Sequence, residues 1–113
     1  MGYYTDFELE VDTDIENLVH VMNAASGYGW EGEDEDSCFM YGVKWYDYPE
    51  DMLKLSREYP KVLFTLRGVG EEQPDIWVHF FKNGIMSGGR AAINYPEYNE
   101  EDHKGEVEDE PKT

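Results

Sequence analysis

The sequence is poor in basic residues. Nine Lys and Arg stand against 26 Asp and Glu in 113 residues, which gives a formal net charge of −17 at pH 7. Residues 1–96 carry −11 and residues 97–113 carry −6, so the excess is not confined to one end. Such a surface repels phosphate backbones, which disfavours direct binding to nucleic acid. It attracts basic protein surfaces instead, including those that hold nucleic acid.

The sequence also lacks long hydrophobic runs and has a single cysteine. No apolar stretch approaches the roughly 20 residues that span a bilayer, and residues 1–12 contain acids where a secretory signal has basic and apolar segments. Cys38, being alone, forms no intramolecular disulfide and no cysteine metal cluster. We interpret it as a small buried strand residue rather than a catalytic thiol. These absences predict a cytoplasmic protein that contacts no membrane.

Aromatic residues, by contrast, are abundant at 15% of the chain. Because each ring buries roughly 150–250 Å², they suffice for one compact domain, which we place at residues 1–96. Residues 97–113 contain almost no apolar side chains beyond Tyr98 and Val107. Their composition predicts an acidic, flexible tail.

Periodicity predicts the secondary structure. Apolar residues alternate in the first strand, and Thr13 and Glu16 have the spacing of a capping box at the start of the first helix. Asp47 and Glu50 repeat this spacing before the second helix, with Pro49 in its first turn. Asn83-Gly84 is the strongest hairpin signal, and Gly88-Gly89 indicates a bulge or a bend. The expected elements are a strand over 3–11, a helix over 14–26, a loop over 28–36, a strand over 38–46, a helix over 49–59, and strands over 62–68, 75–82 and 85–95.

The resulting order, β-α-β-α-β-β-β, predicts an α+β fold. Each helix has one apolar stripe, formed by Ile15, Leu18, Val19 and Met22 in the first and by Met52, Leu55 and Tyr59 in the second. Two such helices cover one face of a mainly antiparallel sheet, in a ferredoxin-like arrangement with an extra C-terminal hairpin. The other face of the sheet is expected to carry Glu8, Glu10, Lys44, Tyr46, Trp77, His79 and Phe81.

Part of this pattern resembles a known family. Gly42-Val43-Lys44-Trp45, the helix over 49–59, Val62-Leu63-Phe64-Thr65-Leu66 and Trp77 follow one another within residues 36–84. Their order is similar to that of the YubB-like ferredoxin-domain proteins of phages and plasmids. The resemblance implies a mobile-element origin, a ferredoxin-like fold and no assigned chemistry. The acidic loop and tail lie outside it. If a phage encodes the protein, its expected location is the host cytoplasm.

No motif points to a catalytic residue, a metal or a cofactor. The acidic run from Glu31 lacks the Asp-x-Asp-x-Asp-Gly order that wraps Ca²⁺, so it is interpreted as solvated. Aromatic side chains among acids are instead typical of protein interfaces, where rings anchor and charges steer. The expected partner-binding residues are Glu31, Glu33, Asp34, Glu35, Asp36, Tyr46, Tyr48, Glu71, Glu72 and Asp75.

The sequence therefore leaves several functions open. The first is an inhibitor, monomeric or homodimeric, that mimics nucleic acid and binds a basic groove of a host nuclease, as anti-CRISPR and anti-restriction proteins do. The second is a small-ligand or enzymatic domain with a pocket lined by Trp77, Phe81 and Tyr95. The third is a structural subunit whose hairpin edge pairs with itself, and the fourth is an acidic cytosolic protein that binds no basic groove.

Overall fold

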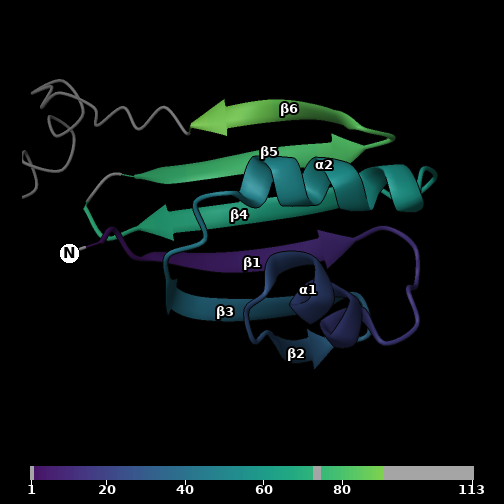
Figure 1. Ribbon diagram of the computed structural model, residues 1–113, viewed down its shortest axis with the longest axis horizontal. Helices are drawn as coiled ribbons and strands as arrows, with labels where there is room; N and C mark the ends of the chain where they lie inside the picture. Colours follow the sequence, from purple (N-terminus) through teal and green to yellow (C-terminus); the bar gives the residue numbers. More distant parts are fainter. Residues whose placement is uncertain (1, 73–74, 91–113) are drawn as a thin grey trace, which may run out of the picture.

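The computed structural model describes residues 2–72 and 75–90, which form two helices and a six-stranded sheet (Figure 1). The α+β class is therefore confirmed. The elements, in chain order, are β1 (Thr5–Val11), α1 (Leu18–Ser26), β2 (Glu31–Asp34), β3 (Ser37–Val43), α2 (Tyr48–Glu58), β4 (Phe64–Gly70), β5 (Ile76–Lys82) and β6 (Ile85–Arg90). No described helix has the length and apolarity to cross a membrane. The expected tail lies outside the described residues.

The strands lie in the order β2-β3-β1-β4-β5-β6, and every neighbouring pair is antiparallel. Both helices cover the same face of this sheet, α1 over the β1–β3 half and α2 over β4 and β5 (Figure 1). We call the other side of the sheet, which no described helix covers, the open face. The sheet is thus buried on one side and exposed on the other.

The core lies between the helices and the sheet. Phe7 and Leu9 of β1, Phe64 and Leu66 of β4 and Phe81 of β5 are almost completely buried. The apolar stripes of the helices meet them as expected: Leu18, Met22, Met52 and Leu55 are buried, while Val19 and Tyr59 are partly so. Alternation in β1 and the helical periodicity were therefore sufficient to identify the core face of these elements.

The start of each helix differs from the expectation. α1 begins at Leu18 rather than 14, because Asn17 takes a left-handed conformation (φ 56°) and Thr13 donates to Asp12 instead of capping the helix. Asp47 precedes α2 but makes no side-chain capping hydrogen bond, so the second capping box does not form. Gly27 ends α1 with a φ of 80°, as its sequence position indicated.

Residues 28–36 are not a loop throughout, because Glu31–Asp34 form the edge strand β2. The element order is therefore β-α-β-β-α-β-β-β. Strand β3 ends at Val43, since Gly42 has a φ of 65° and turns the chain. Tyr41, which precedes the turn, lies on the open face and is exposed, whereas Trp45, which follows it, is buried.

The C-terminal hairpin forms at Asn83-Gly84, both with positive φ (53° and 75°). Its pairing runs without a shift from Lys82↔Ile85 to Trp77↔Arg90, so of the bulge or bend predicted at Gly88-Gly89 the bulge does not form. Gly88 instead allows close approach, because a Cβ there would overlap the backbone of β5. The predicted continuation of this strand beyond Arg90 lies outside the described residues.

The expected composition of the open face is also wrong for β5. Trp77 and Phe81 are buried under the helices, and His79, which alternates with them, lies half-buried on the same side. The β5 residues that face outward are Ile76, Val78, Phe80 and Lys82. Glu8 and Glu10 do lie on the open face, whereas Lys44 and Tyr46 lie beyond the end of β3.

Candidate functional site

The structure divides the described chain into an acidic half and a neutral half. Residues 1–43 contain eleven Asp and Glu and no Lys or Arg, whereas residues 44–90 contain seven of each. The first stretch forms β1, α1, β2 and β3, which lie together, and the second forms α2 and β4–β6 (Figure 1). We call β1, α1, β2 and β3 the acidic half. Its charge has little internal compensation, because the described residues form only two ion pairs, Arg67–Glu10 and Arg90–Asp75.

The acidic residues from Glu31 to Asp36 lie on the edge strand β2 and on its turn to β3, all of them exposed. Asp34 shapes this turn: its Oδ1 accepts hydrogen bonds from the Asp36 N–H and the Ser37 hydroxyl, each at 2.9 Å. These bonds favour the charged form and lower the pKa of Asp34. Glu31, Glu33 and Glu35 make no such bonds within the described residues, so their carboxylates are available to a partner.

Asp36 differs from Asp34, because its neighbours disfavour the charged form of its carboxyl group. Its pKa is raised, chiefly through a hydrogen bond with Asp14 and through desolvation, with repulsion from Asp14, Asp34 and Glu35 adding to the effect. Two neighbouring carboxylates that share a hydrogen bond favour the protonated form of one of them. The described residues contain no group of three or more His, Cys, Asp or Glu placed to hold a metal ion.

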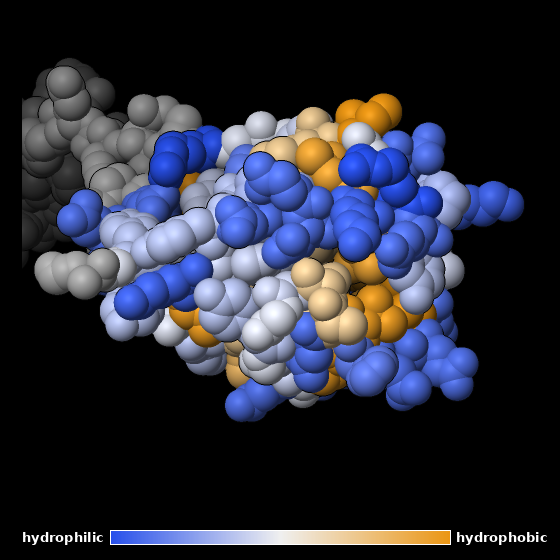
Figure 2. All heavy atoms as spheres, in the orientation of Figure 1, coloured by the Kyte–Doolittle hydropathy of each residue, from blue (hydrophilic) through white to orange (hydrophobic). Residues whose placement is uncertain are grey.

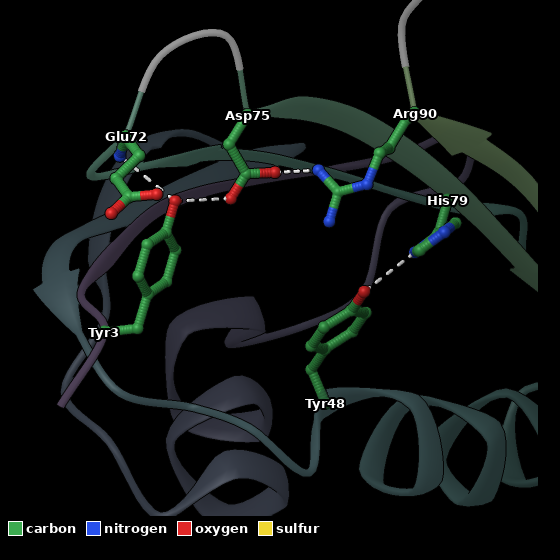
Figure 3. A network of polar contacts seen from close by, with 6 residues as sticks. All are labelled: Tyr3, Tyr48, Glu72, Asp75, His79 and Arg90. Atoms are coloured by element: carbon green, nitrogen blue, oxygen red, sulfur yellow. Dashed lines mark hydrogen bonds and ion pairs between the residues drawn. The ribbon is translucent and has the colours of Figure 1, made fainter.

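A second cluster of predicted residues gathers at the opposite end of β1, around Tyr3 (Figure 3). The Tyr3 hydroxyl donates to Asp75 Oδ2 at 2.6 Å and accepts from the Glu72 N–H at 3.0 Å. Arg90 binds the other Asp75 oxygen. Hydrogen bonds from Tyr3 and then Arg90 lower the pKa of Asp75, while the bond to Asp75 raises the pKa of Tyr3.

The neighbouring backbone completes this cluster. The Tyr4 N–H donates to Glu71 Oε1 and the Tyr3 N–H donates to the Tyr46 hydroxyl, each at 2.7 Å. Glu71, Glu72, Asp75 and Tyr46 therefore hold the segment that precedes β1. Sequence reasoning missed Tyr3 and Arg90, since neither belongs to a pattern and only the fold brings them to the acids. Because Glu71, Asp75 and Tyr46 use their side chains in these bonds, they are poorer candidates for a partner site than the β2 acids. Glu72 takes part only through its backbone N–H.

Tyr48, which the sequence predicted to bind a partner, is half-buried in an aromatic cluster rather than exposed. Its ring stacks on Trp77 with centroids 4.8 Å apart, and its hydroxyl lies 3.2 Å from Nδ1 of His79 (Figure 3). Burial raises the pKa of Tyr48, and burial together with the nearby Arg90 lowers that of His79. A neutral His79 whose Nδ1 accepts a hydrogen bond from the Tyr48 hydroxyl fits both shifts. Tyr46, by contrast, is exposed as expected.

The open face has its own groove, with a volume of about 500 Å³. Carboxylates of β1, aliphatic side chains of β4 and β5, and an exposed tyrosine of β3 surround it. The lining comprises Asp6, Glu8, Tyr41, Arg67, Gly68, Val69, Ile76, Trp77 and Val78. The opposite, helical side is largely hydrophilic, with a hydrophobic strip in the region between the two helices (Figure 2).

Cys38 is 1% exposed, and burial raises its pKa to about 12. The thiol therefore stays protonated at neutral pH, as expected for a buried structural residue rather than a nucleophile.

The chain was also compared with known proteins. A scan against protein-family models, a search of curated proteins and a search of solved structures each found no match. The similarity to the YubB-like ferredoxin-domain proteins thus stays a prediction made from short stretches of sequence.

Proposed function

We propose that the protein is a non-catalytic inhibitor that uses its acidic half to bind a basic, nucleic-acid-binding groove of another protein. One observation carries this proposal: residues 1–43, which form β1, α1, β2, β3 and the segments that connect them, contain eleven acids and no Lys or Arg, while residues 44–90 are electrically balanced. A general need for solubility would not require such one-sidedness. A segregated charge produces a directional field, which steers the association of an oppositely charged partner.

The spacing of the acids supports mimicry of a phosphate backbone. Asp6, Glu8 and Glu10 alternate along β1 on the open face, so they repeat at about 6.8 Å. One DNA strand carries a charge about every 3.4 Å along the axis, so this row presents about one carboxylate for every two phosphates. Glu31 pairs with Phe39, which pairs with Glu8, and this places a second acidic row about 9.6 Å away on the same face.

The fold is compatible with the predicted origin. The strand order β2-β3-β1-β4, with two helices on one face, supports the proposal of a ferredoxin-like β-α-β-β-α-β unit followed by the β5–β6 hairpin. We therefore propose a phage or mobile-element protein that acts in the host cytoplasm against a defence nuclease, in the manner of anti-CRISPR or anti-restriction proteins. A fold of this kind hosts many functions, so the charge and not the fold is the argument.

A capture experiment tests this function. The protein is immobilised and exposed to nuclease-treated bacterial lysate, and bound proteins are then eluted with a short DNA duplex. We expect the eluate to contain a nucleic-acid-binding protein, because mimic and duplex compete for one groove. A purified partner that binds the immobilised protein equally well when saturated with DNA would refute the mimicry.

Two variants of equal net charge control for general electrostatics. Glu31→Gln, Glu33→Gln and Glu35→Gln together neutralise three acids of β2 and its turn, without touching Asp34. Asp47→Asn, Glu50→Gln and Glu58→Gln neutralise three exposed acids of the other half. At low salt we expect the first variant to associate with the captured partner about tenfold more slowly and the second to match the wild type. Equal slowing of both would mean that net charge alone drives binding.

A further inference from the structure

We infer that the open face is the docking surface for a partner segment in which an Arg or Lys is flanked by apolar side chains. This inference rests on the proposed function and assigns its interface. It also distinguishes the part of the open face over β1, β4 and β5 from the β2 edge of the sheet, where apolar side chains are missing: all four β2 residues, Glu31–Asp34, are exposed, and none is hydrophobic.

The open face combines charge with exposed apolar area. Tyr41 is 61% exposed, Val69 39% and Phe80 37%, and Ile85 at the far edge is 67% exposed. These residues belong to the side of the sheet that no described helix covers. Exposed apolar side chains beside a groove are typical of an interaction site. The acids of β1 lie between Tyr41 on one side and Val69 on the other, since β1 separates β3 from β4.

The groove of about 500 Å³ is the point where both features meet. Asp6 and Glu8 stand on one wall, and Val69 and Val78 on the other. A lysine or arginine stem packs well on such an aliphatic wall while its charged head reaches a carboxylate. The Tyr41 ring can also receive a cation on its face. A neutral or anionic occupant would leave the carboxylates desolvated without compensation.

The chain already places one guanidinium on this row of acids. Arg67 Nη1 lies 2.8 Å from Glu10 Oε1, across the β1–β4 pairing, with both side chains about half exposed. Asp6 accepts a hydrogen bond from the Gly42 N–H at 2.8 Å. Glu8, which lies between them, has no hydrogen bond or ion pair within residues 2–72 and 75–90. We therefore assign Glu8 as the acid that receives the partner's cation.

A second copy of this chain is a poorer occupant of the same surface. Two open faces packed together would bring the Asp6, Glu8 and Glu10 rows of both copies into one interface. Like charges across an interface cost several kcal/mol, so this arrangement is disfavoured. A basic, apolar segment satisfies both components of the surface.

Peptide binding to the full chain, followed by amide NMR shifts, tests the inference. The probe is acetyl-Leu-Ser-Arg-Ser-Leu-amide, which in an extended conformation presents Leu, Arg and Leu on one side. We expect it to shift the amides of Glu8, Val69 and Val78. Replacing both Leu by Ser, or Arg by Gln, should weaken binding about tenfold. Equal affinity for all three peptides would overturn the inference.

A matched pair of protein variants tests which acid binds the arginine of the probe peptide. Glu8→Gln and Glu33→Gln remove the same charge from two exposed strand positions, and neither residue makes a bond that the fold needs. We expect Glu8→Gln to lower the affinity for the probe about tenfold and Glu33→Gln to change it less than about twofold. Matching amide spectra of the free variants confirm that both are folded.

The remaining outcomes separate the inference from the proposed function. Shifts confined to Glu31–Asp36 and lost in Glu33→Gln would overturn the docking surface but leave the function standing. Shifts on the open face that depend on protein concentration alone would identify a second copy as its occupant and overturn the inference. If deletion of residues 91–113 shifts amides of the open face, the chain's own C-terminal segment is the occupant and the inference is overturned. If no peptide shifts any amide at low salt, the docking surface is refuted, and DNA competition decides the function independently.

Discussion

The indole ring of Trp77 covers Gly68, its direct cross-strand partner on β4, and fills the space where any side chain at position 68 would lie. The same ring packs against Phe7, with centroids 5.8 Å apart, and stacks on Tyr48 of α2. This contact joins three strands and a helix. It also fixes which face of β5 is buried, and hence which of its side chains remain on the open face.

Gly68→Ala is therefore expected to destabilise the protein by about 1–3 kcal/mol, because the added methyl group overpacks the core. Gly89→Ala is the matched control, since the space around Gly89 on β6 is empty and its backbone is not left-handed. Urea unfolding of both variants measures the difference. Equal midpoints for the two would show that the Trp77 ring does not lie over Gly68.

The Trp77–Gly68 pair also explains why the prediction from sequence assigned Trp77 and Phe81 of β5 to the wrong face of the sheet. Ile76, Trp77, Val78, Phe80 and Phe81 are apolar on both sides of the strand, so alternation cannot choose a face. The choice depends on the register with β4, where a glycine leaves room for the large ring. β1 posed no such problem, because its outward residues are acidic and its inward residues are apolar.

The acidic edge strand was unpredictable for a different reason. β2 reads Glu-Gly-Glu-Asp and has neither β-branched nor aromatic residues, so propensity and periodicity both indicate a loop. It forms because its backbone pairs with β3, which local sequence does not encode. The candidate site was predictable only in part: the acids were identified from composition alone, but the groove beside Glu8 required the sheet order.

The Asp75 carboxylate should stabilise the protein only above acidic pH. Its pKa is lowered in the folded state by hydrogen bonds from Tyr3 and Arg90. The contribution is therefore complete above the unfolded pKa of about 3.9 and is lost as the pH falls through the folded value. Asp75→Asn should lower the melting temperature at pH 7 and match the wild type at strongly acid pH. Glu58→Gln, on the exposed face of α2, should do neither, and a constant deficit for Asp75→Asn at all pH values would contradict the assignment.

The ionised Asp36 carboxylate, unlike that of Asp75, should destabilise the folded protein at neutral pH. Because Asp14 raises its folded pKa, the folded state holds the proton more tightly than the unfolded state. Its favourable contribution is present below the unfolded pKa of about 3.9 and disappears as the pH rises through the folded value. Asp36→Asn should thus raise the melting temperature at pH 7, where it removes a repelled charge, and lose this advantage in acid. Thermal melts at both pH values test this, and addition of about 1 M salt should reduce the gain at pH 7. An Asp36→Asn variant less stable than wild type at pH 7 would show that the carboxylate has a structural partner.

Cys38 should be unreactive until the protein unfolds. Its thiol is buried in β3 opposite Leu9, and burial raises its pKa to about 12. Near pH 8, an unfolded cysteine with a pKa of about 8.5 contains roughly a thousandfold more thiolate, which is the reacting species. We therefore expect a disulfide reagent to modify the native protein about a thousandfold more slowly than the same chain in urea. The unfolded chain is an internal control, because it contains the same single thiol. Comparable rates in the two states would reveal an accessible thiolate, and would favour a catalytic role for Cys38 over the binding function proposed for this fold.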